Sequence, residues 1–102
     1  MTVLAFLRFV LRPEADAEAF ERDLLAVRDL AARQPGFRWS ELGRDPSDRR
    51  RYVVVSAWDE VEQVRAFEHV PEHEEVMARW EPHYAEPLVH RRFVPWVRPP
   101  AP

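Results

Sequence analysis

The chain has 102 residues, of which 46% are hydrophobic and 32% charged, and its formal net charge is −3 at pH 7. This length suits one globular domain, and the composition is too apolar for a disordered chain. The acidic balance argues against nucleic acid as a main partner, and the absence of cysteine excludes disulfides, thiolate metal sites and a cysteine nucleophile. No stretch reaches the roughly 18 apolar residues of a membrane-spanning helix, so we expect no membrane contact and a cytoplasmic protein.

The first half of the chain predicts a strand, a helix and a two-strand hairpin. Residues 2–11 are rich in Leu, Val and Phe and predict a strand that ends before Pro13. A helix is expected next, because acidic residues open it and Pro35-Gly36 closes it. Its buried stripe at helical spacing consists of Ala17, Phe20, Leu24, Val27 and Ala31. Residues 37–44 and 51–58 predict two strands joined by an Asp-Pro-Ser-Asp turn.

The second half predicts a broken helix and a final strand. Asp59 and Glu62 have the spacing of an N-cap and its capping-box partner, which would begin a helix there. Pro71 breaks this helix and opens another, which Pro82 stops. Residues 88–96 predict the last strand. Residues 1–98 then form the domain, and residues 99–102 predict a mobile, proline-rich tail.

The resulting order of elements, β-α-β-β-α-β, predicts a ferredoxin-like α+β fold. Helices on one side of the sheet leave its other face uncovered. The expected strands at 2–11 and 51–58 do not alternate cleanly between apolar and polar residues, as a face in contact with water would require. A second copy of the sheet is the simplest cover, so we predict a homodimer.

The helix after Pro71 contains the most specific candidate for chemistry. His73, Val76, Met77 and Trp80 recur at i, i+3, i+4 and i+7, which puts a histidine on a buried stripe facing the sheet. A histidine in an apolar cleft is a candidate general acid or base, because small environmental shifts move its pKa across neutrality. The alternative is a core histidine that a backbone carbonyl or a water satisfies.

Three further aromatic side chains could help to form a pocket. Trp58 ends the third expected strand and Trp39 lies on its neighbour, where either could hold a flat aromatic ligand or simply pack in the core. Tyr84 follows the last helix in a short link and could line the rim of a pocket.

The sequence predicts neither a metal site nor a cofactor site. His69 and His73 are four residues apart, a spacing that suits two metal ligands on one helix. However, Pro71 lies between them, the helical phase favours an exposed His69, and no third ligand is indicated. A chain of this length with only two glycines has no phosphate-binding loop and no room for a flavin or nicotinamide fold.

Three segments together carry a family resemblance. They are Gln34-Pro35-Gly36-Phe37, then Val53-Val54-Val55-Ser56-Ala57-Trp58-Asp59-Glu60, and then Phe67, His69 and Pro71-Glu72-His73. With the order of elements, they make residues 2–97 resemble the antibiotic biosynthesis monooxygenase (ABM) domain family. The resemblance implies a dimeric α+β barrel, in which two four-stranded sheets face each other and each subunit has a pocket between its sheet and helices.

The resemblance also implies an activity. Some ABM members oxidise aromatic polyketides such as anthrones to quinones with O2 and without flavin, metal or haem. The chain is therefore expected to be a cofactor-independent monooxygenase of secondary metabolism, acting on a small aromatic substrate whose enolate or phenolate reacts with O2. His73 and Trp58 match the family pattern, His73 as base or hydrogen-bond partner and Trp58 as a positioning residue. To the catalytic group we add Tyr84. The expected substrate contacts are Trp39, Phe20, Phe67, Met77 and Trp80.

Two alternatives remain open. This chain also resembles cofactor-free polyketide cyclases of the same superfamily in the His- and Pro-rich start of its last helix. Those enzymes use a histidine–tyrosine pair, which here would be His73 and Tyr84. The chain could instead be a non-catalytic, dimeric ligand-binding protein whose histidines are structural. Haem degradation fits poorly, because the related haem-degrading enzymes use a pocket asparagine and this chain has no asparagine.

Overall fold

A computed structural model describes residues 1–98, so the expected tail at 99–102 lies outside the described residues. The elements are β1 (Val3–Val10), α1 (Ala17–Ala32), β2 (Phe37–Arg44), β3 (Arg51–Trp58), α2 (Val61–Glu68), α3 (Pro71–Trp80), the 3-10 turn η1 (Glu81–His83) and β4 (Val89–Phe93). This order confirms the predicted ferredoxin-like α+β fold. Among residues 1–98, no helix is long and apolar enough to cross a membrane.

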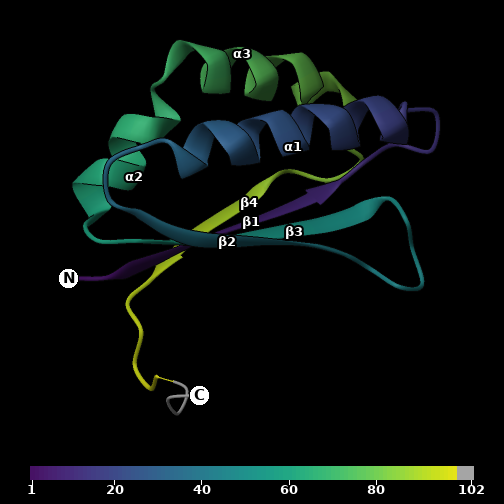
Figure 1. Ribbon diagram of the computed structural model, residues 1–102. Helices are drawn as coiled ribbons and strands as arrows, with labels where there is room; N and C mark the ends of the chain where they lie inside the picture. The colour runs from purple at the N-terminus through teal and green to yellow at the C-terminus, as the bar shows by residue number, and fades with distance from the viewer. Residues whose placement is uncertain (99–102) are drawn as a thin grey trace.

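The four strands form one antiparallel sheet in the order β2-β3-β1-β4, and all three helices lie on one side of it (Figure 1). Because successive residues of a strand point to opposite faces, Phe9 of β1 and its partner Tyr52 of β3 point to the helices. Their neighbours Arg8 and Val53 point to the other side, which we call the open face.

The core consists of two clusters beneath the helices. Phe9, Phe20 and Trp80 belong to a cluster between β1, α1 and α3, and Trp58 and Phe67 belong to a second between β3 and α2. Trp58 is fully buried, with 0% of its surface exposed. The candidate site described below lies where the two clusters meet.

The predicted start of the second helix is wrong by one residue. The N-cap is Glu60 and its capping-box partner is Gln63, rather than Asp59 and Glu62. The backbone N–H of Asp59 donates to the carbonyl of Gly36 at 2.8 Å, which still ties Asp59 to the end of the sheet. Gly36 has a φ of 83°, and a Cβ there would collide with the Gln63 side chain. The helix therefore begins only after this contact.

The last strand is also shorter than predicted. It ends at Phe93 rather than Trp96. Phe93 pairs with Leu4, and β1 begins at Val3, so almost no paired strand remains beyond this point. Pro95 lacks the N–H that a further pair would need.

Candidate functional site

His73 is buried against the sheet, as its spacing predicted. Pro71 is the first residue of α3, where its missing N–H costs nothing, and it restarts the chain as a helix after the break at Val70. His73 then follows within the first turn, and only 8% of its surface is exposed. Its ring meets the Phe67 ring edge-on, with centroids 4.6 Å apart, and its Nδ1 atom is buried without a hydrogen-bond partner.

Burial controls the charge of this histidine. It lowers the pKa of His73 below the ordinary value of 6.5, because the apolar surroundings disfavour the imidazolium, while the carboxylate of Glu68 opposes this effect. His73 is therefore neutral at pH 7. A neutral imidazole has one nitrogen that can accept a proton or a hydrogen bond.

His73 forms part of the wall of two cavities. The inner cavity, about 50 Å³, lies between α1 and the sheet. The outer cavity, about 310 Å³ and more open, lies between α2 and α3 on one side and β1 and β4 on the other. Both cavities are lined by the same five residues, which are Leu7, Ser56, Phe67, His73 and Met77. The shared wall makes the two cavities neighbours, with the histidine at their junction.

Trp58 supports this wall from behind and lines neither cavity. Its ring stacks on Phe67, with centroids 5.4 Å apart and an interplanar angle of 29°. Its indole N–H donates to the Ser56 hydroxyl oxygen at 2.9 Å. Trp58 thus positions Phe67 and Ser56, which in turn contact the space beside His73. Ser56 was not among the predicted site residues.

The other predicted site residues fall into three groups. Phe67 and Met77 line both cavities. Tyr84 lines a separate cavity that shares Met77, and its hydroxyl is buried without a partner, so burial raises its pKa to about 12.

The three remaining predicted contacts line neither cavity. Phe20 and Trp80 pack against each other in the core, with ring centroids 5.2 Å apart. The Trp80 indole N–H donates to Asp23 at 2.8 Å, so this polar group is already satisfied. Trp39 lies on the open face with 47% of its surface exposed, on the side of the sheet away from His73.

A charged cluster that the sequence did not reveal lies at the rim of the outer cavity. Glu68 at the end of α2 lies 2.8 Å from Nε2 of His90 and also binds Arg92, both on β4. His69 also lines this rim, and 79% of its side chain is exposed, as expected. Within residues 1–98, no three His, Asp or Glu side chains are arranged to hold a metal ion.

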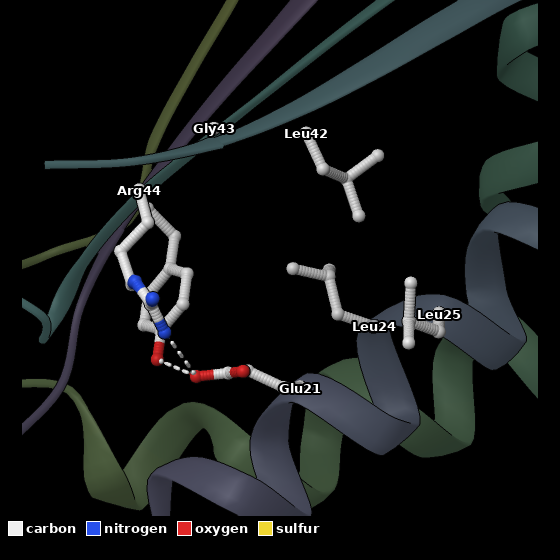
Figure 2. A pocket seen from close by; sticks show the side chains of 7 residues that line it. Glu21, Leu24, Leu25, Leu42, Gly43 and Arg44 are labelled. Carbon is white, nitrogen blue, oxygen red and sulfur yellow. Dashed lines mark hydrogen bonds and ion pairs between the residues drawn. The ribbon is translucent and has the colours of Figure 1, made fainter.

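A groove between α1 and β2 is a further hollow on the helix side of the sheet (Figure 2). Leu24, Leu25 and Leu42 line it, and Glu21 accepts hydrogen bonds from the Tyr52 hydroxyl at 2.7 Å and from Arg44 at 3.2 Å. Burial and the Glu21 carboxylate raise the pKa of Tyr52 to about 12. Because these polar groups satisfy one another, the groove offers no free base, and the cavities at His73 are the better candidate site.

Comparison with known proteins identifies the family. The family model for antibiotic biosynthesis monooxygenase matches residues 2–79. The fold is similar to that of SnoaB, a cofactor-independent oxygenase from Streptomyces nogalater, with a TM-score of 0.85, 21% identity and 98% of each chain covered. It is also similar to Rv0793 from Mycobacterium tuberculosis, with a TM-score of 0.86, 17% identity, and 96% of this chain and 98% of that chain covered.

A third solved structure, PA3566 from Pseudomonas aeruginosa, has a TM-score of 0.83 at 14% identity, with 94% of this chain and 95% of that chain covered. At these identities the solved structures show the fold alone. The search of curated proteins gave no match. The family model covers more than three quarters of the chain, and the chain belongs to the antibiotic biosynthesis monooxygenase family.

Proposed function

We propose that this protein is a cofactor-independent monooxygenase that oxidises a small aromatic, polyketide-like phenol or anthrone to a quinone-type product. The observation that carries the proposal is His73, a buried and neutral histidine with an unpartnered nitrogen at the junction of two apolar cavities. Membership of the ABM family supports it, as does a fold similar to that of SnoaB, itself a cofactor-independent oxygenase.

The reaction that we propose begins with proton removal. His73 accepts the proton of the acidic phenol or anthrone, and the imidazolium stays beside the resulting anion and stabilises it. The electron-rich anion then reduces O2. For an anthrone, the CH2 carbon gives up both hydrogens and four electrons, one oxygen atom becomes its carbonyl oxygen, and the other leaves as water. Phe67 and Met77 contact the ring, and Trp58 holds Phe67 in place.

Incubation with a panel of anthrone-like and poly-β-keto aromatic compounds, in air and under nitrogen, tests the proposal by mass spectrometry. We expect a product that gains oxygen only in air and without added cofactor. His73→Ala should lower kcat/KM at least about 100-fold, the usual contribution of a general base. His83→Ala is the matched control, since His83 is an exposed histidine that lines neither cavity at His73, and it should stay within about twofold of the unaltered protein.

Other outcomes would favour the alternatives. Loss of water or rearrangement at equal mass, in both atmospheres, would indicate a cyclase or isomerase. The histidine–tyrosine pair of such an enzyme has little geometric support here, because Tyr84 and His73 do not line a common cavity. Binding of an aromatic compound with no turnover would indicate a ligand-binding protein.

A further inference from the structure

The two cavities at His73 differ in size and in access. The outer cavity, about 310 Å³, opens to solvent past the polar rim of Glu68 and His90, and its volume is of the order that a small aromatic ligand needs. The inner cavity, about 50 Å³, is too small for an aromatic ring, yet it exceeds the roughly 30 Å³ that one water molecule occupies in the liquid. His73 therefore lies between the outer cavity, which is large enough for an aromatic ring, and the inner cavity, which is large enough only for a very small molecule.

The inner cavity is lined mainly by carbon. Nine of its thirteen lining residues are apolar, and they include Val27 and Ala31 of α1 and Val54 of β3. Its polar lining residues are Arg28, Ser40, Ser56 and His73. A water needs two to four polar partners, whereas apolar cavities stay dry and take up apolar guests such as xenon.

Two of these polar side chains are already engaged. The guanidinium of Arg28 binds the carboxylate of Asp29, at 3.1 Å, on the outer side of α1. The hydroxyl oxygen of Ser56 accepts the hydrogen bond from the Trp58 indole. The hydroxyls of Ser40 and Ser56 and the His73 ring remain as polar groups in the lining, so water is the competing occupant. Because nine of the thirteen lining residues are apolar, we take a small apolar molecule as the better occupant, and the experiment below distinguishes the two.

We propose that the inner cavity is the dioxygen site, with the aromatic substrate in the outer cavity and its reacting carbon beside His73. This inference rests on the proposed function. A ring in the outer cavity would cover the shared wall, so that O2 meets the ionised ring away from bulk water. The C–O bond then forms where the two cavities meet beside His73, the O–O bond breaks, and the second oxygen atom leaves as water with the two hydrogens of the substrate carbon.

Xenon uptake and oxygen kinetics together test this assignment. Val27 lines the inner cavity and not the outer one. Val61 is its matched control, because it is also a partly buried helical valine against the same core cluster, but it lines neither cavity at His73. In crystals under xenon pressure, we expect xenon in the inner cavity of the unaltered protein and of Val61→Phe, and none in Val27→Phe.

The kinetic expectation is specific to oxygen. Val27→Phe should raise the KM for O2 at least fivefold and leave the KM for the aromatic substrate within twofold, and Val61→Phe should change neither. If the added ring prevents folding, Val27→Leu makes the same test with a smaller increase in volume.

Several results would overturn the assignment. One is an ordered water with two or more hydrogen bonds in place of xenon, and another is a higher KM for the aromatic substrate instead of O2 in Val27→Phe. Oxygen uptake by a protein whose inner cavity takes no xenon would overturn this inference and leave the proposed function standing. A xenon-filled cavity in a protein that consumes no O2 with any substrate would overturn the proposed function, and the dioxygen role with it.

Discussion

At the scale of single residues, His73 is the costliest feature of the site. A titratable ring with one unpartnered nitrogen occupies a place that an apolar side chain would fill at no electrostatic cost. The Trp58 indole, in the same cluster, shows the opposite arrangement, because its single N–H is satisfied by Ser56. A buried polar group without a partner calls for an explanation, and in the wall of a cavity a functional role is one such explanation.

Burial of His73 should make the folded state sensitive to acid. The unfolded chain binds a proton at the ordinary pKa near 6.5, whereas burial lowers the pKa of His73 in the folded state. The unfolded state therefore holds more protons below pH 6.5, and the stability that the neutral ring contributes is lost as the pH falls from 6.5 through the folded-state pKa. Urea denaturation at pH 7 and pH 5 should show a smaller loss of unfolding free energy in His73→Gln than in the unaltered protein.

His69→Gln supplies the control for this prediction. The His69 side chain is 79% exposed, so its replacement should leave the pH dependence of stability unchanged. Equal losses between pH 7 and pH 5 in the unaltered protein and in His73→Gln would contradict the prediction.

The sequence predicted one part of the site and missed another for a physical reason. His73 and Met77 were found because a buried helical stripe is a property of local spacing. Ser56 and Glu68 were missed because their roles depend on partners from other elements, Trp58 in the case of Ser56 and β4 in the case of Glu68. Sequence spacing does not state such long-range partners.

At the scale of elements, α1 forms one side of the inner cavity. Its buried face supplies Leu24, Val27 and Ala31 to the lining, and its position depends on how the helix begins. Asp16 is the N-cap, and its carboxylate accepts a hydrogen bond from the backbone N–H of Ala19 at 3.1 Å. Such a cap satisfies one of the free N–H groups of the first turn. Its negative charge also interacts favourably with the positive end of the helix dipole.

Removal of this cap should destabilise the protein. We expect Asp16→Ala to lower the free energy of unfolding by about 1 kcal/mol, the typical value for an N-cap, as measured by urea denaturation. Asp29→Ala is the matched control, since Asp29 is an exposed aspartate within the same helix, and it should change stability by less than about 0.5 kcal/mol. A cost for Asp29→Ala equal to that for Asp16→Ala would contradict the capping role.

The bounds of the elements show where the local sequence was sufficient to predict the start and end of a helix or strand. The strands at 37–44 and 51–58 were predicted with their observed bounds, because turn residues flank them on both sides. The start of α2 and the end of β4 were not, because the contact between Asp59 and Gly36 and the limited length of β1 decide them. These are tertiary constraints, and no local pattern carries them.

At the scale of the whole molecule, the apolar side chains on the open face of the sheet remain to be explained. Trp39, Ala57, Leu4 and Phe93 are paired in register, so they form one apolar row across all four strands. Trp39 is 47% exposed and Phe93 is 53% exposed. The helices cover only the other face (Figure 1). Ala57, within the row, is 1% exposed, so the exposed surface is that of the two aromatic ends. Exposed aromatic side chains at the ends of an apolar row are typical of a protein–protein interface, which agrees with the homodimer predicted from the strand pattern.

We therefore predict that the chain is a dimer in solution and that the open face is its interface. Light scattering after size exclusion should give the mass of two chains. Trp39→Glu should weaken association at least about 30-fold, because loss of a buried interface tryptophan typically costs about 2 kcal/mol or more and the new carboxylate would be buried without a partner. Leu25→Glu is the control, since Leu25 is 43% exposed, nearly as much as Trp39, but lies on α1. A monomeric unaltered protein, or equal dissociation in both variants, would exclude the open face as the interface, and Trp39 would then have to be explained by another partner on that face.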